Sequence, residues 1–221
     1  MGVAIGALNA FCIVQLKVVP MIATMGTWMA FKGAGLMIIN SSTLSNFPAS
    51  FKAIVQDWNL FGVSTLIVVM LIVAVVAALL LKYVSFFHQA YFIGSNPESA
   101  RLSGINVDNW KVAVYTLSGF FIGMCALFYA AAYTTITPGT GAGQEMNGIT
   151  GVIIGGTSMS GGSGTMVGTL IGVFIMSVLK TGLANCGLQA PWQTFLTGAV
   201  VIGAVLLDIA RTKAANRVKK G

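Results

Sequence analysis

The sequence predicts an all-α fold, a polytopic transmembrane helical bundle with about seven spans, some of them short or broken. Hydrophobic residues make up 56% of the 221 residues and charged residues only 8%, whereas a soluble domain carries about 25% charged residues. Apolar runs recur at lengths close to the roughly 20 residues that a helix needs to cross a bilayer. The 27 glycines and five prolines suit membrane helices better than disorder, because most of the remaining residues are aliphatic.

The predicted spans follow one another along the whole chain, as one transmembrane domain over 1–221. The clearest is VSTLIVVMLIVAVVAALLLKY at 63–83, in which Lys82 is the only charged residue. The full set, in chain order, is 1–16, 20–39, 63–83, 110–133, 144–158, 164–183 and 192–210. The fifth and sixth are short, and we expect them to be covered by other helices, since a broken helix is tolerated in lipid only when protein or a cavity surrounds it.

Basic residues predict the orientation of these spans. Five of the twelve Lys and Arg residues lie in the tail ARTKAANRVKK, directly after the last span. Positive charge gathers on the cytoplasmic side of a membrane, so the C-terminus and the segment 84–109 are predicted to be cytoplasmic. The alternation then places Met1 outside without a signal peptide. We therefore expect the chain to be the C-terminal two-thirds of a longer protein with more N-terminal spans, or a product that needs a separate N-terminal piece.

The uncharged stretch VIIGGTSMSGGSGTMVGTLIGVF, at 152–174, tests whether the glycines bind phosphate. A P-loop needs a lysine after its last glycine, and a dinucleotide site needs an acidic residue about 20 positions further on. The stretch contains no lysine, and the next acidic residue is Asp208. The sequence therefore argues against a phosphate site here.

The spacing of the small residues predicts close helix packing instead. Small residues four apart lie on one face of a helix and let two backbones approach closely in lipid. This spacing occurs at Ser160, Gly164, Gly168 and Gly172, at Gly151 and Gly155, and at Gly2, Gly6 and Ala10. The core SMSGGSG at 158–164 is too rich in glycine for the interior of a stable helix. We expect two helices to break there, as helices often do in transporters.

The polar segment GSNPESARLSGINVDNWK, at 94–111, predicts a short helix. Pro97 suits the first turn, and Glu98 favours the positive end of the helix dipole. Gly104 suits the end of the helix. Six or seven residues span only about 10 Å, too short to cross a membrane. An exposed, capped helix of this length favours a docking element over an ordinary loop.

Two of these motifs carry a resemblance to a known family. GSNPESARLSGINVDNWKVAVYTLSG, followed by GQEMNGITGVIIGGTSMSGGSGTMVGTLIG, resembles the membrane subunits of ribose-type bacterial ABC importers, and LKVVPMIATMGTWMAFKGAGLMI is similar to their corresponding segment. The resemblance implies a permease that pairs with a second permease subunit and a cytoplasmic ABC ATPase, and that receives its solute from a binding protein. Members of the family are usually longer, with more spans at the N-terminus.

The resemblance also assigns residues to the docking of the ATPase. In that family a cytoplasmic loop with the pattern N-P-x-x-A-R-x-x-G forms a coupling helix that sits in a groove of the ATPase. The matching residues here are Asn96, Pro97, Ala100, Arg101 and Gly104, with Glu98 and Ser99 at the variable positions. Asn147 stands where an aspartate is usual, which weighs against an ionic role near Glu145.

The function expected from the resemblance is that of a sugar-import permease in the bacterial inner membrane, with ATP bound by the partner ATPase. We expect no catalytic residue, metal site, cofactor or nucleic-acid partner. The weakly polar candidates for lining the pathway are Thr157, Ser158 and Ser160, although such side chains equally suit hydrogen bonds to helix carbonyls. Glu145 favours a role at the start of its helix over one in transport. The alternatives are an amino-acid-type ABC permease, and a secondary transporter or channel.

Overall fold

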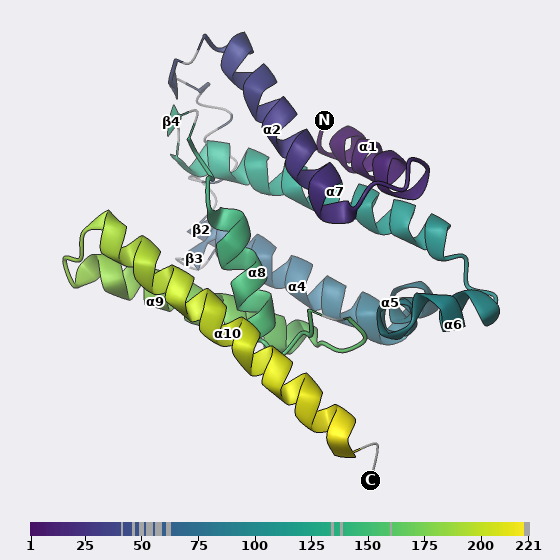
Figure 1. Ribbon diagram of the computed structural model, residues 1–221. Coiled ribbons are helices and arrows are strands. Elements are labelled where there is room, and N and C mark those ends of the chain that lie inside the picture. The colour runs from purple at the N-terminus through teal and green to yellow at the C-terminus, as the bar shows by residue number, and fades with distance from the viewer. Residues whose placement is uncertain are drawn as a thin grey trace. The chain divides into compact units, whose positions relative to one another are not determined.

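The computed structural model describes residues 1–40, 42–45, 47, 48, 51, 55, 59, 60, 63–133, 135–137, 139–159 and 161–218. This part of the chain is mostly helical (Figure 1). The strands in it are two residues long and form two antiparallel pairs: β1 (Leu44–Ser45) with β4 (Thr135–Ile136), and β2 (Asn59–Leu60) with β3 (Val63–Ser64). The predicted all-α class is confirmed.

The chain divides into two compact units, each built from two separate stretches of sequence. Unit 1 comprises Met1–Ile72 and Gly104–Thr140, with α1 (Gly2–Val14), α2 (Pro20–Ile38), α7 (Val107–Tyr133) and the start of α4 (Thr65–Tyr83). Unit 2 comprises Val73–Ser103 and Gly141–Gly221, with the rest of α4, α5 (Ser85–Ser95), α6 (Pro97–Leu102), α8 (Gln144–Ile154), α9 (Met166–Asn185) and α10 (Ala190–Val218). The single domain over 1–221 stays a prediction.

In unit 1, α1 lies along α7 (Figure 1). The contact is between backbones: a Cβ atom on Gly6 would lie 2.5 Å from the carbonyl oxygen of Tyr115, and one on Gly119 would lie 2.9 Å from the Cα atom of Gly6. Ala10, one helical turn beyond Gly6, is only 1% exposed. The packing stripe predicted at Gly2, Gly6 and Ala10 is therefore confirmed, and its partner is a second glycine-containing face on α7.

In unit 2, α8 packs against α9, and α10 packs against both. A Cβ atom on Gly151 would lie 2.9 Å from the Cα atom of Val173, and Gly155 faces the backbone of Gly168. Only helices without side chains at these points approach so closely, and in lipid such approach is a main source of helix association. The stripe predicted at Gly151 and Gly155 is confirmed.

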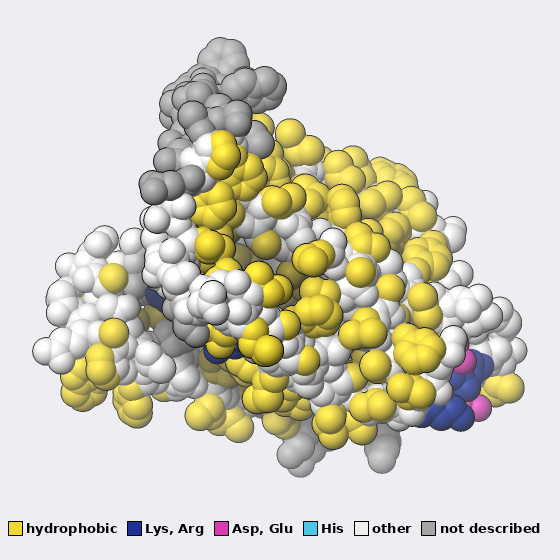
Figure 2. Space-filling model, turned by 90° about the horizontal axis from the view of Figure 1, so that it is seen from above, with side chains coloured by type: hydrophobic (Ala, Val, Ile, Leu, Met, Phe, Trp, Pro, Cys, Tyr) yellow, Lys and Arg dark blue, Asp and Glu magenta, His cyan; other side chains and the backbone are white. Residues whose placement is uncertain are grey.

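The described helices bury many alanines, along with some larger apolar residues, and expose many large apolar side chains. The buried hydrophobic set contains Ala10, Ala23, Ala74, Ala100, Ala130, Ala131 and Ala204, whereas Phe174 is 69% exposed and Ile122 66%. Figure 2 shows hydrophobic side chains spread over much of one face, with acidic side chains seen only beside basic ones at its right edge. A surface of this kind suits lipid rather than water, since lipid tails solvate large apolar side chains.

Every predicted span contains a helix. Among the described residues, three helices are long and apolar enough to cross a membrane: Thr65–Tyr83, Val107–Tyr133 and Met166–Asn185. Gly2–Val14 and Ala190–Leu206 are shorter apolar helices. The eleven residues of α8 rise only about 16 Å, which agrees with the expectation of short or broken spans. The segment 84–109 also contains α5, a helix that the sequence analysis does not separate from the loop.

Candidate functional site

The helix predicted after Gly94 is present as α6, and Asn96 caps its start. The Oδ1 atom of Asn96 accepts hydrogen bonds from the backbone N–H groups of Glu98 at 3.0 Å and Ser99 at 3.1 Å. Pro97 occupies the first helical position, where its missing N–H costs nothing. Two of the N–H groups that a helix leaves unpaired at its start are thereby satisfied, so six residues form a defined helix.

The end of α6 is equally well defined. Ser103, the C-cap residue, donates its backbone N–H to the carbonyl oxygen of Ser99 at 3.1 Å, and its hydroxyl donates to the same oxygen at 2.9 Å. Gly104 follows with φ of +82°, a left-handed conformation that favours glycine. The predicted helix stop at Gly104 is therefore found at the backbone level.

The faces of α6 differ in exposure. Ala100 is 4% exposed and faces the protein, where α6 packs back on α5. Glu98, Arg101 and Leu102 are exposed, and Leu102 reaches 85%. The helix therefore presents an acidic, a basic and a large apolar side chain on the surface. Leu102 is a candidate docking residue that the sequence analysis misses, since only the fold shows which of the apolar residues near α6 is left uncovered.

The break between α8 and α9, residues 155–165, is an ordered turn in its described part. The backbone N–H of Ser158 donates to the carbonyl oxygen of Ser163 at 3.0 Å, and Gly161 donates to Ser158 at 3.1 Å. Gly156, Gly161 and Gly162 have φ between +81° and +89°, which explains why glycine recurs in this turn. The predicted interruption of the two helices is confirmed.

The break lies against the end of α5, more than 60 positions earlier in the sequence. A Cβ atom on Gly94 would lie 2.6 Å from the backbone nitrogen of Gly162, and one on Gly161 would lie 2.6 Å from the carbonyl oxygen of Gly94. The hydroxyl of Tyr91 donates a hydrogen bond to the carbonyl oxygen of Gly164 at 2.9 Å. These contacts lie within unit 2, and sequence reasoning from one chain does not find them because they join distant segments.

The packing glycines predicted on the sixth span take two different places. Gly168 and Gly172 are in α9 and face α8; a Cβ atom on Gly172 would lie 2.6 Å from the backbone nitrogen of Gly155. Gly164 differs from the expectation, because it lies before α9 rather than on it. Thr165 caps α9 by accepting the N–H of Gly168 at 3.1 Å, which starts the helix two residues after Gly164.

Gly164 nevertheless lies in a crowded position. A Cβ atom there would lie 2.7 Å from the hydroxyl oxygen of Thr157. Thr157 itself is half-buried, and its hydroxyl lies 3.5 Å from that of Thr169. Ser158 bonds through its backbone within the turn. The third pathway candidate, Ser160, lies outside the described residues, and the pathway role of Thr157 and Ser158 stays a prediction.

Glu145 lies in the first turn of α8, and its Oε1 atom accepts a hydrogen bond from the backbone N–H of Gly143 at 3.3 Å. The sequence analysis favours this role for Glu145 at the start of its helix, where its carboxylate lies near the positive end of the helix dipole. The amide of Asn147 donates to Gln144 at 3.1 Å, so it bonds within the same turn. Among the described residues no group of three or more His, Cys, Asp or Glu side chains is arranged to hold a metal ion.

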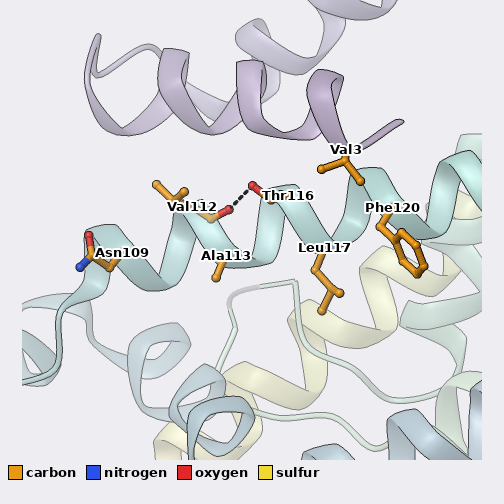
Figure 3. A pocket seen from close by; sticks show the side chains of 7 residues that line it. All are labelled: Val3, Asn109, Val112, Ala113, Thr116, Leu117 and Phe120. Carbon is orange, nitrogen blue, oxygen red and sulfur yellow. Dashed lines mark hydrogen bonds between the residues drawn. The ribbon is translucent and has the colours of Figure 1, made fainter. Parts of the chain in front are cut away.

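A groove of about 490 Å³ runs along α7 beside α1 (Figure 3). Its lining residues are Val3, Asn109, Val112, Ala113, Thr116, Leu117 and Phe120. Figure 3 shows Val3 pointing from α1 towards α7, and Thr116 donating its hydroxyl to the carbonyl oxygen of Val112 at 2.7 Å. The hydroxyl of Thr116 is thus used within α7, and Asn109 supplies the one side-chain amide of the lining. The groove therefore offers few polar groups to a solute. Thr157 and Ser158 do not line it.

Comparison with known proteins gives one family and several relatives. The family model described as branched-chain amino acid transport system / permease component matches residues 1–205. The galactose/methyl galactoside import permease protein MglC of Haemophilus influenzae is 31% identical over 94% of this chain and 63% of its own length. The ribose import permease protein RbsC of Escherichia coli K12 is 32% identical over 94% of this chain and 66% of its own length.

A third relative is the autoinducer 2 import system permease protein LsrC of Enterobacter sp. strain 638. It is 30% identical over 94% of this chain and 60% of its own length. No solved structure matches the chain. The chain thus spans less than two thirds of the length of these curated relatives, and the matches cover almost all of the chain itself.

Proposed function

The chain belongs to the family of branched-chain amino acid transport system permease components, and from that premise we propose that it is the transmembrane permease subunit of an ATP-driven ABC importer for a sugar or a similar small polar solute. Its relatives are named as import permeases for galactose, ribose and autoinducer 2. The observation that carries the proposal is α6, a capped and exposed helix of six residues that lies in the sequence between two helices able to cross a membrane.

In this proposal α6 is the helix that docks on a cytoplasmic ATPase. Arg101 and Glu98 supply charge, and Leu102 supplies an apolar side chain to be covered. Ala100 is buried and α6 packs on α5, so α6 is held to the protein on one side and exposes the other. Asn96, Pro97 and Gly104 keep the helix short and oriented. ATP is bound and hydrolysed by the ATPase, and this chain supplies no catalytic residue and no cofactor.

The remaining partners follow from the same proposal. A second permease subunit, identical or homologous, completes the pathway, and a solute-binding protein delivers the solute from outside.

The chain lies in the bacterial inner membrane with its C-terminus and the segment 84–109 in the cytoplasm, as the basic tail favours. A tag after residue 221 that antibodies reach in intact spheroplasts would contradict this orientation. Thr157, Ser158 and Ser160 are the proposed pathway residues.

Co-purification with the ATPase tests the role of α6. We expect the protein expressed from its complete gene with its cognate ABC ATPase to form a stable complex, and Arg101→Glu to lose most of that complex. Reversal of one charge at a docking surface replaces attraction by repulsion. The matched control is Arg101→Lys, which keeps the charge and is expected to retain more of the ATPase. Equal recovery of the ATPase with Arg101→Glu and the unsubstituted protein would remove α6 from the docking site.

The family description and the relatives point to different solutes, so the solute class has its own test. The family is named for branched-chain amino acids, whereas the relatives are named for galactose, ribose and autoinducer 2. Uptake of labelled ribose or galactose that unlabelled sugar inhibits, and leucine does not, is the expected result. Inhibition by leucine instead would assign the chain to the amino-acid-type importers.

A further inference from the structure

We propose that Tyr91 and Gly94 of α5, with Gly161, Gly162 and Gly164 of the helix break, form a rigid joint that carries a displacement of α6 into the α8–α9 pair. This inference rests on the proposed function, in which α6 is the segment that the ATPase moves. Tyr91 and Gly94 contact neither the solute nor the ATPase in this account. They are therefore positioning residues, and their effect is on coupling.

The first step of the path is the junction between α5 and α6, which consists of one residue. Asn96 is at once the C-cap of α5 and the N-cap of α6. Its backbone N–H donates to the carbonyl oxygen of Phe92 at 3.1 Å, and its own carbonyl oxygen accepts from Ala100 at 3.1 Å. Its side chain is engaged as well, by the first turn of α6. A junction whose backbone N–H, carbonyl oxygen and side-chain oxygen are all engaged leaves α6 little freedom to move without the end of α5.

The second step is the contact of Gly94 with the break. The backbones meet directly: a Cβ atom on Gly94 would lie 3.3 Å from the Cα atom of Gly161 as well as 2.6 Å from the nitrogen of Gly162. A Cβ atom on Gly162 would in turn lie 3.2 Å from the Cα atom of Ser95. Backbone atoms cannot rotate away as a side chain can, so a shift of α5 is transmitted to the turn rather than absorbed.

The third step is a pair of hydrogen bonds that tie the turn to two helices. The hydroxyl of Tyr91 holds the carbonyl oxygen of Gly164 at 2.9 Å, two residues before α9 begins. The backbone N–H of Met159 donates to the Oδ2 atom of Asp208, in α10, at 3.2 Å. The turn is thus held by α5 on one side and by α10 on another, in addition to its own internal hydrogen bonds.

The receiving end of the path is the α8–α9 pair. Gly155, at the end of α8, lies against the backbone of Gly168 and Gly172 in α9. Closely packed helices move as rigid bodies, and interfaces of this kind shift between discrete arrangements rather than deforming continuously. A push on the turn therefore changes the position of α8 and α9 together. This is the step by which closure of the ATPase would open or close a pathway near Thr157.

The test uses variants outside the docking helix. Tyr91→Phe removes only the hydroxyl that bonds Gly164, and Gly94→Ala places a methyl group against the backbone of Gly162. Gly148→Ala is the matched control, a helical glycine in the same unit with no atom within 4 Å of an added Cβ. Each protein is expressed from the complete gene and reconstituted with its ATPase in nanodiscs. Hydrogen exchange at 155–165 is then compared with and without a non-hydrolysable ATP analogue.

We expect nucleotide to change the exchange of 155–165 in the unsubstituted complex and in Gly148→Ala. Tyr91→Phe and Gly94→Ala should still bind the ATPase but lose that change. In proteoliposomes the solute imported per ATP should fall at least about fivefold, the low end of typical coupling between sites. A role in folding alone would lower the yield of folded protein and leave the nucleotide response of the folded fraction intact.

The outcomes separate the joint from the function on which it rests. If both α5 variants respond to nucleotide as the unsubstituted complex does, while Arg101→Glu loses the ATPase, the joint is wrong and the docking role stands. If Arg101→Glu keeps the ATPase, the docking role fails and the joint fails with it. Loss of the response in Tyr91→Phe, with the response kept in Gly148→Ala, supports the joint even if Gly94→Ala does not fold.

Discussion

Asn96 shows how one side chain can define a short helix. A helix of six residues is far below the length at which helices are stable alone in water, about 12–15 residues. Here Asn96 satisfies two N–H groups at the start of α6, and Gly104 turns the chain after its end. Burial of Ala100 holds the helix to the protein. Capping and the burial of Ala100 therefore supply stability that a longer helix would gain from additional backbone hydrogen bonds.

The cap at Asn96 gives a prediction at the residue scale. We expect Asn96→Ala to weaken α6, since loss of an N-cap side chain costs about 1 kcal/mol. Affinity for the ATPase, measured by titration of the detergent-solubilised complex, should fall by roughly fivefold, the factor that corresponds to this energy. Asn96→Asp keeps the accepting oxygen and is the control. Equal affinity of the Ala and Asp variants would show that capping of α6 does not matter for docking.

Gly164 marks the limit of sequence reasoning at this scale. Its spacing from Gly168 and Gly172 predicts that all of them share one helix, because small residues four apart line one face. The structure starts α9 at Met166 because the hydroxyl of Thr165 caps it. A threonine inside a glycine-rich run is not a decisive cap signal, since threonine also occurs within helices of membrane proteins. The break was predictable, and its last residue was not.

At the scale of elements, glycine-to-glycine contact is the main feature of both units. The α1–α7 pair and the α8–α9 pair each place glycines of one helix on the backbone of the other. Water cannot drive helices together inside a bilayer, so close van der Waals packing must do so. The sequence predicted three of these faces by spacing alone. It did not predict that Gly119 packs against Gly6, since the partner of a helix face can be identified only from the folded structure.

The α8–α9 contact gives a prediction for its pair of helices. We expect Gly168→Leu to destabilise the protein, because its side chain would enter the space held by the carbonyl oxygen of Gly155. Overpacking typically costs about 1–3 kcal/mol, and contact with backbone puts this case at the upper end. Thermal unfolding in detergent measures the loss. Gly182→Leu, on the same helix with nothing within 4 Å of an added Cβ, is the control, and equal Tm values for both variants would refute the packing role.

At the scale of the whole molecule, composition alone determined most of the architecture. Charged residues are so scarce that the chain cannot cover itself with a water-compatible surface, and the described helices expose their large apolar side chains as this requires. Each of the seven predicted apolar segments contains a helix. The contact between α5 and the break was not predictable, because Tyr91 and Gly164 lie 73 positions apart and local patterns carry no information on such pairs.

The family and the relatives indicate a transport role for this membrane architecture. Few acidic residues lie in the predicted spans, whereas ion-coupled transport usually depends on intramembrane carboxylates. The sequence therefore favours the proposed ATP-driven import over ion-coupled transport. In the proposed function, the solute-binding protein largely selects the solute, and the permease supplies a pathway lined by small, weakly polar side chains.

Import driven by ATP is the central claim, and transport in proteoliposomes tests it most directly. The protein expressed from its complete gene is reconstituted with its ATPase and its solute-binding protein, and labelled ribose or galactose is supplied on the side of the binding protein. We predict accumulation against a gradient that requires ATP on the ATPase side and that Arg101→Glu abolishes. Accumulation that proceeds without ATP, or that follows a proton or sodium gradient, would contradict the assignment as an ABC importer subunit.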